Sequence, residues 1–135
     1  EQFTVTCSGS ILTRRFILSA AHCFIFEAYK PSHVRVGANN IDSRYAEQRE
    51  ILDVNLHPNY NSENKTFYFD IAIVSVKEDI QFSVRISPIC LLDSSSQHPG
   101  SGIGISVQGW GKTERGGGKD VSEVTVIVRS KESFS

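Results

Sequence analysis

The sequence ILSAAHC, residues 17–23, joins a short apolar run to two alanines, a histidine and a cysteine. An apolar run of this length, following the polar and basic residues 13–15, is typical of the end of a buried strand. The two alanines favour a tight helical turn, so we expect His22 at a strand end with its side chain facing a cleft. A histidine held there suits proton transfer near neutral pH, and Cys23 beside it can tie the turn to another segment.

Three further motifs stand in a fixed order around this segment: CSGSIL at residues 7–12, DIAIV at 70–74 and VQGWG at 107–111. Any one of them alone would be a weak signal. Together with ILSAAHC they resemble the signatures of the trypsin-like (chymotrypsin-family, S1) serine proteases. The resemblance extends over nearly all of the chain.

The resemblance implies an all-β fold, an antiparallel double β-barrel of the trypsin-like serine protease type. Residues 1–135 would form a partial domain, with the first barrel in 1–92 and the inter-barrel linker and start of the second barrel in 93–135. Alternation agrees with strands: LDVNL, residues 52–56, would place its three apolar side chains on one face of a half-buried strand. Alternation alone would not distinguish a barrel from a sandwich.

The resemblance also assigns His22 and Asp70 to a Ser-His-Asp triad. His22 would accept the serine proton and deliver it to the leaving amine, while Asp70 would hold the imidazole tautomer. The apolar residues 71–74 predict a strand buried on both faces, so a carboxylate at its head would need a partner. The alternative from the residues alone is an aspartate that caps a turn before a strand.

The third member of the triad is absent from the printed sequence. No GDSGGP motif occurs, and the serines of RSKESFS, residues 129–135, lack the glycine amides of an oxyanion hole. We therefore predict a serine-type endopeptidase, made as a zymogen and acting on protein or peptide substrates, of which these 135 residues are inactive as given. The alternative is a non-catalytic serine protease homologue that acts as a secreted binding or regulatory protein.

The chain has three cysteines, an odd number for a secreted domain. By the resemblance, Cys7 and Cys23 form a disulfide, which implies an extracellular, secreted protein. Cys90, in SPICLL, is predicted to form an interchain disulfide with a propeptide or regulatory module. The alternatives are a cysteine buried as a small hydrophobic residue and a bond to the second half of the enzyme.

Composition excludes several other classes. The net charge is −1 and 21% of residues are charged, so we expect no nucleic-acid partner. No apolar run approaches the roughly 18 residues of a membrane span. No Cys-x-x-Cys occurs, and His33, His57 and His98 lack partners at metal spacing. We expect no metal and no cofactor.

Two surface loops carry additional hypotheses. In calcium-binding members of the family, the loop at residues 38–47 supplies carboxylates, but Ala38 and Gln48 stand at or near the acidic positions. A plain surface loop is therefore expected, with calcium binding as the alternative. Asn64-Lys65-Thr66 is an acceptor sequence for N-glycosylation at Asn64, in a loop that leads to Asp70.

Overall fold

The structure is a computed structural model that describes residues 4–63, 68–93, 95, 99–113, 116–117 and 122–127. The chain divides into two compact units, Glu1–Cys90 and Leu91–Ser135. The assignment of residues 1–92 and 93–135 to parts of two barrels remains a prediction.

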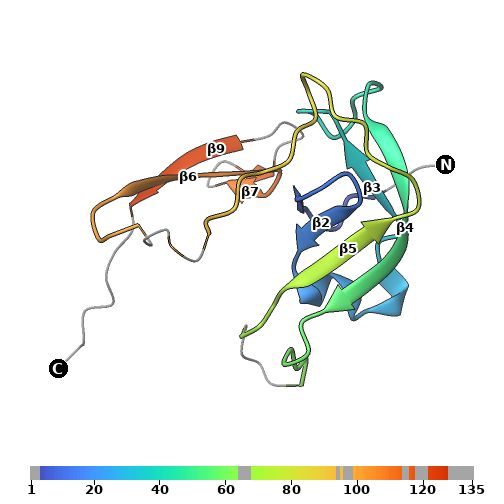
Figure 1. Cartoon of the computed structure of the whole chain (residues 1–135), viewed down its shortest axis with the longest axis horizontal. Helices are drawn as coiled ribbons and strands as arrows, with labels where there is room; N and C mark the ends of the chain where they lie inside the picture. The colour runs from blue at the N-terminus through green and yellow to red at the C-terminus, as the bar shows by residue number, and fades with distance from the viewer. Residues whose placement is uncertain are drawn as a thin grey trace. The chain divides into compact units, whose positions relative to one another are not determined.

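The first unit contains one five-stranded antiparallel sheet, which curls into a half-barrel (Figure 1). The order of strands in the sheet is β1-β2-β5-β4-β3. Its strands are β1 (Ser10–Ile11), β2 (Phe16–Ser19), β3 (His33–Val36), β4 (Glu47–Leu56) and β5 (Ala72–Val76). The all-β fold class predicted from the sequence is confirmed.

The core lies against the inner face of β5, the central strand. Ala72, Val74 and Val76 alternate along β5 and are almost completely buried, because successive side chains of a strand point to opposite faces. They pack with apolar residues of neighbouring segments: Ile17, Phe24, Val36, Ile80 and Ile86. Burial on both faces was expected at residues 71–74, but Ile71 is 47% exposed. Ile71 precedes β5, and within the strand the second face is half-buried at Ile73 and buried at Ser75, so the expectation fails at the residue before the strand.

A β-bulge in β4 changes which of its side chains reach the core. The register with β5 shifts between Ile51 and Asp53, so one extra residue is inserted on β4. Ile51 and Val54 pack against the core, whereas Leu52 and Leu56 are 59% and 39% exposed. The prediction that the three apolar side chains of residues 52–56 share a buried face is therefore wrong for the two leucines.

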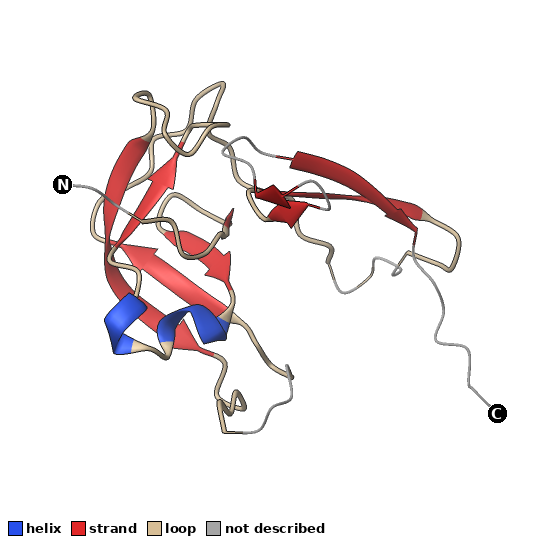
Figure 2. Ribbon diagram, turned by 180° about the vertical axis from the view of Figure 1, so that it is seen from behind, coloured by secondary structure: helices blue, strands red, loops and turns tan. Residues whose placement is uncertain are grey.

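Two 3₁₀ helices, η1 (Ala21–Phe24) and η2 (Glu27–Tyr29), follow β2. Ala21 and Phe24 are buried and anchor η1 to the core. Figure 2 shows both helices at one end of the sheet, the same end as the loop between β4 and β5. Segments far apart in the sequence therefore meet at this end.

In the second unit, β6 (Gly104–Gly109) pairs with β9 (Ser122–Ile127), and β7 (Lys112–Thr113) pairs with β8 (Gly116–Gly117), both antiparallel. Among the described residues, no helix has the length and apolar character needed to cross a membrane.

Candidate active site

His22 lies in the tight turn that follows β2. Ala20 has extended backbone dihedrals, and the Cys23 N–H then donates to the Ala20 carbonyl at 3.3 Å, which closes the first turn of η1. The buried residues on either side of His22, Ala21 and Phe24, fix this turn. The His22 side chain is 54% exposed, so the imidazole can be reached from solvent.

Asp70 approaches His22 from the loop that enters β5, 48 residues along the chain. The strand register explains the meeting, because Ser19 at the end of β2 pairs with Ala72 at the start of β5. Asp70 Oδ1 accepts the His22 main-chain N–H at 2.8 Å, and Oδ2 lies 2.6 Å from His22 Nδ1. One carboxylate therefore contacts both the backbone and the ring of the histidine.

Asp70 is a partly buried carboxyl group, with 15% of its side chain exposed. Burial raises its pKa, but hydrogen bonds from the His22 main chain and side chain, the His22 charge and a hydrogen bond from the Ala21 main chain together outweigh it, so the pKa of Asp70 lies below its ordinary value. The carboxylate is therefore the ionised partner at neutral pH, and it can only accept hydrogen bonds. His22 Nδ1 must then be the donor, which leaves Nε2 as the acceptor in the neutral imidazole.

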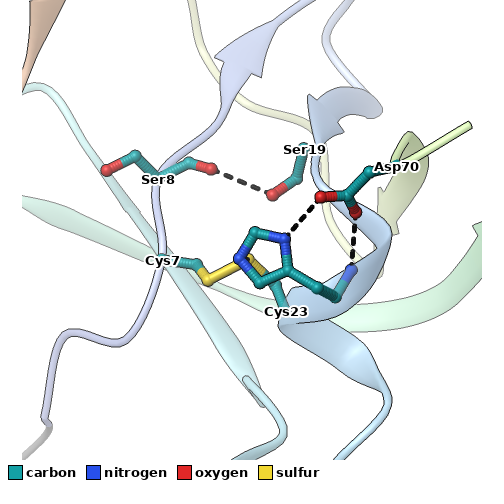
Figure 3. Close-up of a disulfide and its surroundings, with 6 residues drawn as sticks. Cys7, Ser8, Ser19, Cys23 and Asp70 are labelled. Atoms are coloured by element: carbon teal, nitrogen blue, oxygen red, sulfur yellow. Dashed lines mark hydrogen bonds and ion pairs between the residues drawn. A yellow bond between two sulfur atoms is a disulfide. The ribbon is translucent and has the colours of Figure 1, made fainter. Parts of the chain in front are cut away.

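The turn that carries His22 is tied to the N-terminal segment. Cys7 and Cys23 form a disulfide with an S–S distance of 1.99 Å and a Cα–Cα distance of 6.2 Å. The Ser19 hydroxyl also donates to the Ser8 carbonyl at 2.9 Å (Figure 3). Cys23 Sγ lies 3.8 Å from His22 Nε2, so the disulfide packs beside the imidazole.

Among the described residues, one group of three potential metal ligands lies within 4.8 Å: Cys7, His22 and Cys23. The two sulfurs are joined in the disulfide and so cannot supply the thiolates that bind metals. This group therefore does not fit a metal ion.

Three other residues that the sequence analysis considered are Cys90, Asn64 and His98. Cys90 is exposed and is the free cysteine of the chain. Asn64, the candidate glycosylation site, and His98 lie outside the described residues.

The loop between β3 and β4, considered above for calcium, is held by an arginine. The guanidinium of Arg35, on β3, donates to the main-chain carbonyls of Ile41 and Ser43, the latter at 3.0 Å. The Asp42 N–H donates to the Asn40 side chain at 2.8 Å, which forms an Asx-turn. A positive charge on a side chain thus meets the carbonyl oxygens of this loop.

Sequence reasoning missed a contact just before Asp70. The rings of His57 and Phe69 stack with centroids 4.8 Å apart and an interplanar angle of 14°. In the sequence, His57 is followed by Pro58 and is typical of a turn, and Phe69 ends the polar segment 59–69. The two are separated by a loop whose length and sequence give no periodic signal, so pattern analysis could not pair them.

Comparisons of the sequence and of the structure with known proteins all find trypsin-like serine proteases. A family model described as Trypsin matches residues 1–135. The serine protease Hayan of Drosophila melanogaster is 40% identical over 107 residues, covering 78% of this chain and 16% of that protein. The CLIP domain-containing serine protease B4 of Anopheles gambiae is 36% identical over 127 residues, covering 84% and 35%. Among solved structures, neuropsin, a serine protease expressed in the limbic system of mouse brain, superimposes with a TM-score of 0.79 at 23% identity, covering 92% of this chain and 54% of that chain. The chain thus spans only part of the length of each of these proteins.

Proposed function

Because the chain belongs to the trypsin family of serine proteases, we propose that the protein containing it is a serine endopeptidase in which His22 is the general base and Asp70 orients it. One observation carries this proposal: the Asp70 carboxylate contacts both the main-chain N–H and Nδ1 of His22. An aspartate that merely capped a turn would need only the first of these contacts.

The two contacts have separate roles in the proposed mechanism. The bond to the main chain fixes the carboxylate relative to η1, and the bond to Nδ1 fixes the ring and its tautomer. His22 Nε2 takes the proton of the attacking serine and later gives it to the leaving amine. Asp70 stays ionised and stabilises the imidazolium formed in between.

The proposal assigns neither the nucleophilic serine nor the oxyanion hole to these 135 residues, because the GDSGG motif does not occur in them. A polypeptide of these 135 residues is expected to hydrolyse no peptide ester and to take no label from a fluorophosphonate. Stoichiometric labelling of any of its serines would contradict this expectation.

The test of the proposed function uses the full-length protein. His22→Ala should lower kcat by about 10⁴–10⁶-fold, because the members of a triad act as a unit. His33→Ala, a change to an exposed histidine on β3, is the matched control and should leave kcat unchanged. A His22→Ala variant that keeps most of its activity would overturn the assignment. A folded wild-type protein that is inert to fluorophosphonate would favour the non-catalytic homologue.

We also propose that the protein is extracellular and that Cys90 bonds to an upstream regulatory segment. The Cys7–Cys23 disulfide supports an oxidising compartment. The exposure of Cys90 supports a bond to another segment, and the Anopheles relative is described as CLIP domain-containing. Reduction of the activated full-length protein should release a separate light chain, and Cys90→Ser should release it without reductant. A light chain that stays attached in that variant would contradict the proposal.

A further inference from the structure

Both residues that flank Asp70 in the chain are in contact with His57. The ring of His57 stacks on Phe69, and its main-chain N–H donates to the carbonyl of Ile71 at 2.9 Å. We propose that His57 is a positioning residue for Asp70: it clamps the chain before and after the aspartate and so aims the carboxylate at His22. The consequence for turnover rests on the proposed function, but the positioning itself does not.

The backbone at Asp70 is tightly curved. The Ile71 N–H donates to the Phe69 carbonyl at 2.7 Å, which encloses Asp70 in a three-residue turn at the start of β5. The His57–Ile71 bond continues the pairing of β4 with β5 by one step beyond Leu56 and Ala72. It therefore anchors the C-terminal side of this turn to the sheet.

The N-terminal side of the turn requires a different anchor. Phe69 has a φ of +59°, a left-handed conformation that few residues other than glycine adopt. Asparagine and aspartate can support it through a short polar side chain, but phenylalanine has no such group. The Phe69 side chain is 48% exposed, so burial in the core does not hold it either. The stack on His57 holds this ring against the turn that follows β4.

The His57 ring is itself fixed before it meets Phe69. Its Nδ1 accepts the Asn59 N–H at 3.2 Å, and its carbonyl accepts the Tyr60 N–H at 2.9 Å. These bonds close the turn after β4 and set the plane of the imidazole. A histidine thus combines two properties at this position: an acceptor for the turn and an aromatic face for Phe69.

The geometry of Asp70 explains why this clamp matters. The carboxylate must reach two atoms of His22 at once, at 2.8 and 2.6 Å. A backbone rotation at Phe69 would displace both oxygens, and displacements of about 1 Å at a catalytic group can cost on the order of 100-fold in rate. Loss of the stack should therefore act through the bond between Asp70 and His22.

Two substitutions of His57 in the full-length protein separate its two properties. His57→Asn can still accept the Asn59 N–H through an Asx-turn but removes the stack. His57→Phe keeps an aromatic face for Phe69 but removes the acceptor. We expect His57→Asn to lower kcat by about 10–100-fold with KM changed by less than about threefold, and His57→Phe to stay near the wild type.

A second pair changes the other partner. Phe69→Leu should behave like His57→Asn, and Phe69→Tyr like the wild type. Equal losses in the aromatic and non-aromatic members of either pair would overturn the proposal, as would wild-type kcat in His57→Asn. Thermal unfolding of each variant identifies any loss that comes from failure to fold.

A spectroscopic measurement tests the clamp independently of turnover. In protein carrying ¹⁵N-labelled histidine, the His22 Nδ1–H bound to Asp70 should give a slowly exchanging, low-field proton signal, assigned by its loss in His22→Ala. His57→Asn should weaken or abolish this signal and His57→Phe should keep it. If the wild type has the signal but no peptidase activity, the proposed function fails and the clamp stands. If His57→Asn keeps the wild-type signal, the clamp fails whatever the activity.

Discussion

Replacing Asp70 with asparagine in the full-length protein would remove a charge while keeping the size of the side chain. The amide oxygen could still accept the His22 main-chain N–H, but the amide nitrogen would then face Nδ1 as a second donor. The imidazole would carry its proton on Nε2, the atom that must accept the serine proton. The substitution therefore changes the tautomer of the base as well as its stabilisation.

The size of the effect follows from the contact between the two side chains. With Asp70 Oδ2 2.6 Å from His22 Nδ1, the centres of the two charges lie about 4 Å apart, which corresponds to about 4 kcal/mol at the effective dielectric constant of a partly exposed pair. Because 54% of the His22 side chain is exposed, the effective dielectric constant of about 20 that is typical of pairs near a protein surface is appropriate. At 1.36 kcal/mol per tenfold change, kcat should fall by about 10³-fold.

The assay is the steady-state hydrolysis of a peptide amide substrate at a pH where wild-type activity is maximal. Asp53→Asn is the matched control: Asp53 is an exposed carboxylate on β4 whose contact is to the Asn55 side chain, and its loss should leave kcat unchanged. A folded Asp70→Asn variant that loses less than about tenfold in kcat would show that the carboxylate does not stabilise the protonated His22.

Three further predictions concern stability. Gly9→Ala should cost about 1–3 kcal/mol of unfolding free energy, because an added Cβ would lie 2.7 Å from a core side-chain atom and 2.8 Å from a strand carbonyl, whereas Gly100→Ala meets nothing within 4 Å and should be neutral in urea titrations. Replacing Cys7 and Cys23 with serine opens a loop with a sequence separation of 16 and should cost about 3 kcal/mol in the chain-entropy model; a midpoint equal to that of the wild type would contradict it. The lowered pKa of Asp70 means that its ionised form favours the folded state, so this contribution is complete above the pKa of the unfolded chain and is lost as the pH falls below about 3.9. The wild type should then lose more stability than Asp70→Asn between neutral pH and pH 2, and parallel curves would rule the contribution out.

The sequence motifs predicted the family and the fold because they lie in segments whose geometry is set locally. An apolar run, two alanines and a histidine specify a strand followed by a tight turn, and β2 and η1 have that arrangement. The structure brings together His22 and Asp70, the two residues that the motifs singled out. Their catalytic roles remain predictions.

Other features depend on registers and contacts that no local pattern encodes. The bulge at Ile51 and Asp53 moves two leucines out of the core, and its position is set by pairing with β5 rather than by the alternation of β4 itself. The left-handed conformation of Phe69 could not be predicted either, since phenylalanine has no intrinsic preference for it. These features arise from tertiary contacts across long loops.

The hydrogen bonds from Arg35, on β3, bear on how the loop between β3 and β4 responds to the surrounding medium. The guanidinium of Arg35 supplies positive charge to the carbonyls of Ile41 and Ser43, and it is covalently part of the chain. Unlike a bound cation, the guanidinium is not removed by a chelator or by dilution. The order that Arg35 gives this loop therefore persists wherever the domain is folded, whether the surrounding fluid is rich or poor in divalent ions.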